Sequence, residues 1–141
     1  NTVDCVMATE VLEHCFEPQQ ILGEIFRVLK PGGKFFFTVP FLWPLHEVPY
    51  DAYRYTPFSL DKLFREAGFN QNEIKALGGW DASLAQMMGL WVRRRPLAGF
   101  KRTLLSKLAL IGVKYLLSKD ERPQDLNGTH MITGLTGIAV K

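Results

Sequence analysis

Residues 3–40, VDCVMATEVLEHCFEPQQILGEIFRVLKPGGKFFFTVP, contain two apolar runs separated by an amphipathic segment. The first run, residues 3–8, is apolar almost throughout, which predicts a strand buried on both faces, as in a parallel sheet. Apolar residues at helical spacing predict a helix that stops at 31–33, and the β-rich run 34–41 predicts a second strand. The helical stripe consists of Ile21, Leu22, Ile25, Val28 and Leu29. This order predicts a βαβ unit with a right-handed crossover.

The chain continues with a second helix and further strands. TPFSLDKLFREAGF (56–69) predicts a helix with Thr56 as N-cap and Gly68 at its C-terminal end. NEIKALGGW (72–80) predicts a short strand, and THMITGLTGIAVK (129–141) is again β-rich. The alternation of elements predicts an α/β domain.

Two helical patterns occupy the region between these strands. DASLAQMMGLWV (81–92) predicts a helix with Asp81 as a candidate N-cap, and residues 93–118 predict a basic amphipathic helix or helix pair. The apolar stripe of the latter consists of Leu97, Phe100, Leu104, Leu108, Ile111 and Tyr115. Lysines and arginines fall between these positions.

Composition suggests one folded domain of 141 residues, 47% hydrophobic and 22% charged. Two cysteines do not form a disulfide framework, and Cys5, within an apolar run, is expected to be buried. Residues 1–90 hold 7 Lys and Arg against 11 Asp and Glu, whereas residues 91–141 hold 10 against 3.

The start has no signal-peptide pattern and no apolar run of spanning length, so a cytoplasmic location is expected. A start without Met suggests a fragment of a longer protein.

Three motifs carry a resemblance to a known family: DCVMATEVLEH (4–14), EIFRVLKPGGKFFFTVP (24–40) and HEVPYDAYRYTPFSLDKLFREAGF (46–69). Together they resemble class I S-adenosylmethionine-dependent methyltransferases, and more closely the type 11 methyltransferase-domain family. The resemblance implies a Rossmann-like fold, in which a mostly parallel sheet ends in an antiparallel strand and carries a helical insertion. It also implies S-adenosylmethionine as cofactor and methyl transfer to a small-molecule or glycan- or lipid-linked acceptor.

The sequence also departs from the family. The Gly-rich loop after the first strand, which holds the cofactor, and the acidic residue that ends the second strand are absent. Residues 1–141 therefore resemble the C-terminal portion of one methyltransferase domain, with a helical insertion at 87–125. A rival hypothesis is a non-catalytic binding or assembly module that retains only this half. In either case an exposed edge strand predicts a homo-oligomer.

Cofactor-side residues are implied where the first strand ends, because ligands of open α/β sheets bind beyond the carboxyl ends of the strands. By resemblance these residues are Ala8, Thr9, Glu10 and His14. The alternative is that Glu10 and Glu13 are merely solvated and that His14 caps a helix.

Acceptor-side residues are implied in the loop VPFLWPLHEVPYDAYRYTPFSL (39–60), which follows the second strand. The catalytic candidates are His46, Asp51, Tyr53 and Arg54, with Tyr55 beside them. A histidine can remove a proton from the acceptor, and Tyr and Arg can orient a sugar, phosphate or carboxylate. The alternative is a structural crossing in which Arg54 pairs with Asp51 and the tyrosines pack on the next helix. His46, Glu47 and Asp51 have no recognised metal-ligand spacing, so no metal site is predicted.

The basic segment 91–118 has three interpretations. It can form a lid or dimer contact over the substrate site, a peripheral membrane contact, or a solvated helix with a buried stripe. Nucleic-acid binding is not predicted, because no recognised module accompanies the basic charge.

Overall fold

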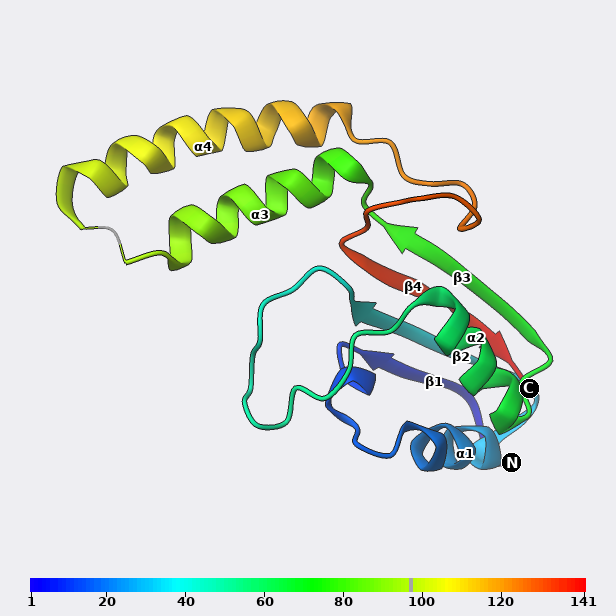
Figure 1. The fold of residues 1–141 in the computed structure, drawn as a ribbon. Helices are drawn as coiled ribbons and strands as arrows, with labels where there is room; N and C mark the ends of the chain where they lie inside the picture. Colours follow the sequence, from blue (N-terminus) through cyan, green and yellow to red (C-terminus); the bar gives the residue numbers. More distant parts are fainter. Residues whose placement is uncertain (97) are drawn as a thin grey trace. The chain divides into compact units, whose positions relative to one another are not determined.

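The computed structural model describes residues 1–96 and 98–141 (Figure 1). Leu97, which was predicted to lie on an apolar helical stripe, is outside the described residues. The elements in chain order are β1 (Val3–Thr9), η1 (Leu12–His14), α1 (Pro18–Val28), β2 (Leu29–Pro40), α2 (Pro57–Ala67), β3 (Gln71–Leu77), α3 (Trp80–Arg94), α4 (Gly99–Lys119) and β4 (Gly134–Val140).

The chain divides into two compact units. Residues 1–75 and 134–141 form the first, called here the sheet unit, and residues 76–133 form the second, called the hairpin unit. The predicted organisation as one domain with an insertion at 87–125 remains a prediction.

The strands form one mixed sheet in the order β1-β2-β4-β3. β1 and β2 are parallel, and β4 runs antiparallel to β2. Backbone hydrogen bonds join Asn70 to Val140 at one end of β3 and Thr133 to Leu77 at the other. β3 is therefore antiparallel to β4 and parallel to β1 and β2. This confirms the predicted Rossmann-like α/β sheet, mostly parallel with a final antiparallel strand.

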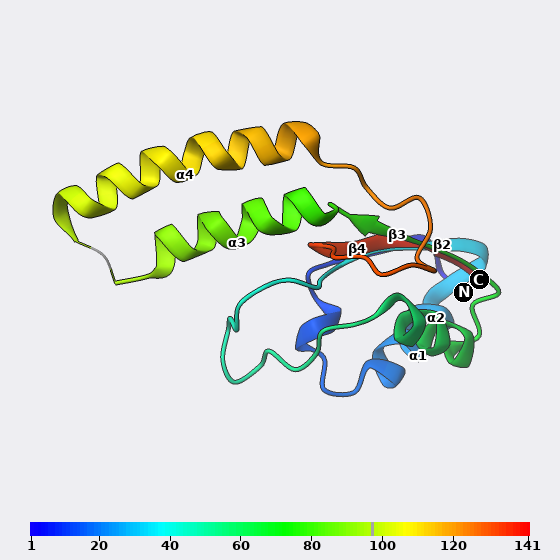
Figure 2. The same cartoon turned by 45° about the horizontal axis from the view of Figure 1, so that its top comes forward.

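The core of the sheet unit lies on the face that α1 and α2 cover (Figure 2). Phe35 and Phe37 on β2 point toward this face and meet Phe64 of α2 and Phe69, with ring centroids 4.9 to 6.1 Å apart. All four rings are almost completely buried. Burying a large aromatic side chain is among the strongest single contributions to folding, so this cluster fixes α2 on the sheet, and Phe26 of α1 meets it at Phe69.

β1 is not buried on both faces as the sequence suggested. Its register with β2 pairs Met7 with Phe36 and Cys5 with Lys34, on the face opposite the helices. Met7 is 69% exposed, and Cys5 is exposed, not buried as expected. The reason is that β1 is an edge strand and that α1 and α2 cover only the other face.

Helix boundaries in the sheet unit follow local chemistry. α2 begins at the predicted cap, where the Thr56 hydroxyl accepts from Ser59 N–H, and it ends at Gly68 with a left-handed φ of 105°. α1 ends at Val28, earlier than predicted, because residues 29–33 already belong to β2. The β1–β2 register shifts between Val3 and Cys5 to accommodate this extra length.

The hairpin unit consists mainly of α3 packed against α4. The predicted N-cap, Asp81, lies inside α3, and Asp120 takes the capping role instead. Its carboxylate accepts from the N–H groups of Gly79 and Ala82 at 2.8 to 3.1 Å. A capping group from a distant part of the chain cannot be identified from local sequence.

α4 buries none of its side chains within the described structure. Phe100 is 79% exposed, and Leu108 and Ile111 are exposed as well, so the expected buried stripe is absent. In the described ranges 1–96 and 98–141, no helix has both the length and the apolarity that crossing a bilayer requires.

Candidate functional site

The carboxyl ends of β1 and β2 bring the two predicted site segments together in the sheet unit. The two strands are parallel, so the chain leaving Thr9 and the chain leaving Pro40 emerge at the same edge of the sheet. Glu10 adopts a left-handed φ of 54°, which turns the chain out of β1 and into η1. Non-glycine residues in this region are uncommon and cluster at functional sites.

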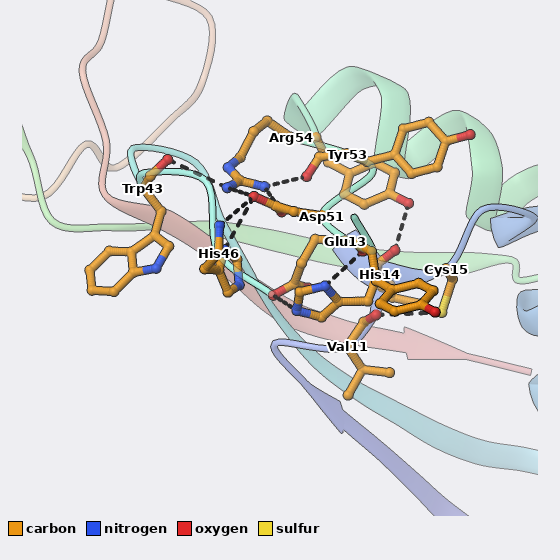
Figure 3. A network of polar contacts seen from close by, with 12 residues as sticks. Val11, Glu13, His14, Cys15, Trp43, His46, Asp51, Tyr53 and Arg54 are labelled. Carbon is orange, nitrogen blue, oxygen red and sulfur yellow. Dashed lines mark hydrogen bonds and ion pairs between the residues drawn. The ribbon is translucent and has the colours of Figure 1, made fainter. Parts of the chain in front are cut away.

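The loop of residues 41–56 is fastened to η1 and the residues after it. Both tyrosine hydroxyls that were predicted to face an acceptor donate to backbone carbonyls here, and Figure 3 shows Tyr53 within this network. The hydrogen bonds are Ala52 N and Tyr53 N to Glu13 O (2.9 and 3.0 Å), Tyr55 Oη to Leu12 O (3.0 Å) and Tyr53 Oη to Phe16 O (3.1 Å). Burial raises the pKa of the Tyr55 hydroxyl, so this group remains a hydrogen-bond donor. The contacts fix the loop above the sheet edge.

An ion pair closes the loop on itself. Arg54 Nη1 and Nη2 donate to the two oxygens of Asp51 at 2.6 and 2.8 Å. Arg54 also donates to the carbonyl of Pro44, and the backbone N–H of His46 donates to Asp51. The Arg54 guanidinium holds the pKa of the Asp51 carboxyl well below its usual range. The predicted pairing of these two residues is therefore present, and both side chains serve to order the loop.

The two histidines lie together. The rings of His14 and His46 meet edge to face, with centroids 4.8 Å apart. His14 Nδ1 lies 3.0 Å from the Tyr50 carbonyl oxygen, and His46 Nδ1 lies 3.3 Å from Asp51 Oδ2. One histidine from the cofactor-side prediction and one from the acceptor-side prediction thus belong to a single cluster.

Glu13, which was predicted at most to be solvated, completes this cluster. Its side chain is 0% exposed, and neither carboxylate oxygen has a hydrogen-bond partner among the described residues. Glu13 Oε1 lies 3.8 Å from His14 Nε2. Burial raises the pKa of the Glu13 carboxyl, and the nearby charge of Glu10 adds to this effect. The only signal in the sequence was its position beside His14 after a strand.

The remaining predicted cofactor residues lie at the end of β1. Ala8 is buried opposite Phe37, whereas Thr9 pairs with Thr38 and is exposed, as is Glu10. Thr9 and Glu10 therefore present polar groups to solvent beside the cluster. Their role in cofactor binding remains a prediction.

Comparison with known proteins supports the resemblance seen in the motifs. A family model described as a methyltransferase domain matches residues 1–37. The ubiquinone/menaquinone biosynthesis C-methyltransferase UbiE of Salmonella arizonae is 40% identical over 58 residues, which is 39% of this chain and 23% of that protein. The same protein of Salmonella paratyphi B matches equally. The chain thus spans under a quarter of the length of these curated relatives.

Solved structures support the fold. A putative methyltransferase of Haloferax volcanii, in complex with the Trm112 methyltransferase activator, has a TM-score of 0.56 at 21% identity over 99% of this chain and 54% of its own. A SAM-dependent methyltransferase of Archaeoglobus fulgidus has a TM-score of 0.54 at 15% identity over 99% of this chain and 60% of its own. Phosphoethanolamine N-methyltransferase 2 of Haemonchus contortus, in complex with S-adenosyl-L-methionine, has a TM-score of 0.54 at 17% identity over 98% of this chain and 33% of its own.

Proposed function

We propose that this chain, whose resemblance to class I S-adenosylmethionine-dependent methyltransferases the comparisons confirm, forms the C-terminal portion of such an enzyme. One observation carries the proposal. The polar cluster stands beyond the carboxyl ends of β1 and β2, where open α/β sheets bind ligands, and β1 lies in the segment that matches the family. Thr9, Glu10 and His14 would face the cofactor.

In this proposal S-adenosylmethionine supplies an electrophilic methyl group, and the chain supplies position and a proton acceptor. Residues of the loop would hold the acceptor's oxygen or nitrogen toward the methyl group that the bound cofactor would supply. The proton of the acceptor passes to His46, whose ring Asp51 orients. Asp51 and Arg54 act as positioning residues because they are hydrogen-bonded to each other. Tyr53 acts in the same way through its bond to Phe16 O.

The surface of the loop supports an acceptor with an apolar part. Five large apolar or aromatic side chains on the loop are exposed, although loops are usually polar: Trp43, Leu45, Val48, Tyr50 and Tyr53. A small molecule or a glycan- or lipid-linked acceptor would place its apolar part on this surface and its nucleophile near the histidines. The exposed apolar and basic groups of α4 fit either a contact between two copies or a peripheral membrane contact.

S-adenosylmethionine binding tests the proposal. Calorimetry would compare this chain with a longer natural protein that includes the sequence upstream of it. We expect saturable binding by the longer protein and weakened binding after Glu10→Ala, with Glu121→Ala, at an exposed residue of the hairpin unit, as the matched control. Absence of binding by both forms would overturn the proposal and favour the assembly module.

A further inference from the structure

We propose that Glu13, His14 and His46 bind one divalent transition-metal cation. Each residue offers a ligand atom, and these atoms all lie within 4.8 Å of one another. Ligand atoms around an ion at about 2.1 Å are roughly 3.0 to 3.5 Å apart, so the widest separation has to shorten by roughly 1.3 to 1.8 Å. No metal site was predicted from the sequence because Glu13 and His14 are more than thirty residues away from His46 in the chain.

The buried carboxylate of Glu13 is the strongest argument for a cation. A buried carboxylate normally pairs with a cation or accepts hydrogen bonds, because removing it from water unpaired is costly. Among the described residues neither oxygen of Glu13 accepts a hydrogen bond, its nearest basic atom is His14 Nε2 at 3.8 Å, and its side chain is 0% exposed. A cation bound between Glu13 and the two imidazoles would explain why this carboxylate is buried.

The hydrogen bond of His14 leaves a lone pair on the side of Glu13. A carbonyl oxygen can only accept, so the 3.0 Å contact with Tyr50 O places the hydrogen on His14 Nδ1. In the neutral ring His14 Nε2 then carries the lone pair, and it lies 3.8 Å from Glu13 Oε1. A cation or a proton between these two electron-pair donors would offset their repulsion.

His46 lies beside a carboxylate, as metal-bound histidines often do, although its Nδ1 makes no hydrogen bond among the described residues. Its Nδ1 lies 3.3 Å from Asp51 Oδ2, and the Arg54 pair keeps that carboxyl ionised. A carboxylate beside one ring nitrogen favours hydrogen on that nitrogen and leaves the other as the electron-pair donor. Asp51 is thus a positioning residue for His46.

The donor set decides the kind of cation. Two imidazoles and one carboxylate suit Zn²⁺, Co²⁺, Ni²⁺ or Fe²⁺, whereas Mg²⁺ prefers oxygen ligands only. The backbone bonds from Ala52 and Tyr53 to Glu13 O hold η1 and the loop together, so both sources of ligands are fixed relative to each other.

A cation here would change one step of the proposed methyl transfer, and this consequence rests on the proposed function. An imidazole that donates its lone pair to a metal cannot accept the proton of the acceptor. The cation would instead bind an acceptor oxygen and lower the pKa of its hydroxyl. This assigns an oxygen nucleophile to the acceptor.

Metal binding can be measured without cofactor or acceptor, so its outcome is independent of the proposed function. The metal-free protein would be titrated with Co²⁺ followed by visible absorption, and with Zn²⁺ in calorimetry. We expect one ion per chain, visible d–d bands from Co²⁺, and no competition from millimolar Mg²⁺.

Matched variants decide whether these residues are the ligands. Glu13→Gln keeps the shape of the side chain, and we expect at least about a tenfold loss of Zn²⁺ affinity for it and for His46→Ala. His130→Ala, an exposed histidine of the hairpin unit, should bind as the unaltered protein does. Circular dichroism checks the fold of each variant. One ion bound equally by all variants, or no saturable binding, would overturn the proposal.

Discussion

The sheet unit and the hairpin unit bury their apolar residues very differently. The large fully buried side chains, among them Phe35, Phe37 and Phe64, belong to the sheet unit. In the hairpin unit the buried residues are mostly small, and Trp91 and Leu108 are exposed. The sheet unit therefore carries its own hydrophobic core, whereas much of the apolar surface of the hairpin unit has no cover within that unit.

The two units also differ in charge. The sheet unit has 8 Lys and Arg against 10 Asp and Glu, and the hairpin unit has 9 against 4. A basic surface with exposed aromatic and aliphatic groups is suited to contact with another molecule, and a buried aromatic cluster is suited to stability. The sheet unit thus holds the stabilising aromatic core, whereas the hairpin unit leaves a basic and partly apolar surface exposed.

The largest expected effect on stability comes from replacing one phenylalanine in each unit with alanine. Phe64→Ala should lower the free energy of unfolding by about 3 to 5 kcal/mol, because it opens a cavity in the aromatic cluster. Phe100→Ala on α4 should change it by less than about 0.5 kcal/mol, because that ring is 79% exposed. Urea unfolding followed by circular dichroism measures both. Equal losses would show that α4 is covered in solution.

The Asp51–Arg54 pair should matter more than a surface pair. Arg54→Met leaves the Asp51 carboxylate, whose side chain is 2% exposed, without its main partner. Arg65→Met breaks the exposed pair with Asp61 in α2 and should have little effect. We expect a clearly larger fall in the urea midpoint for Arg54→Met. Similar midpoints for the two variants would mean that the loop does not depend on this pair.

Asp120 should stabilise the hairpin unit by capping α3. Asp120→Ala removes the acceptor for Gly79 and Ala82 N–H and should cost about 1 kcal/mol. Asp81→Ala is the control, since the sequence favoured Asp81 as the cap and the structure does not. Thermal unfolding monitored at 222 nm compares the two variants. A larger loss for Asp81→Ala would contradict the assignment of the cap.

The smallest expected effect is a change in the mass of a self-associated form. Copies could meet through the edge strand β1 of the sheet unit or through α4 of the hairpin unit. The exposed edge strand β1 predicts pairing between copies, so light scattering should give a mass above that of the monomer. Replacing Cys5 and Met7 with Lys should lower that mass, because charged edges resist pairing. Leu108→Lys is the matched change in the hairpin unit. A loss of mass with Leu108→Lys alone would identify α4 as the contact, and a monomer at high concentration would contradict the prediction.

Local patterns predicted most of the elements. The capping chemistry at Thr56 and Gly68 and the apolar periodicity around Leu22 and Leu60 were sufficient, since neighbouring residues decide these features. Burial was predicted less well. Cys5 and the α4 stripe were expected to be buried, but apolarity alone does not say whether another element covers a residue.

The sequence by itself determined the α/β class, the βαβ unit, the family resemblance and the two segments from which the site is built. Only the tertiary structure joined Glu13 and His14 to His46, because the parallel register of β1 and β2 brings residues more than thirty positions apart to one edge. It likewise gave α3 its cap from Asp120 and turned the loop tyrosines toward backbone carbonyls. Neighbouring residues in the chain decide where helices and strands form. Burial and contacts between distant residues depend on which surfaces the fold brings together.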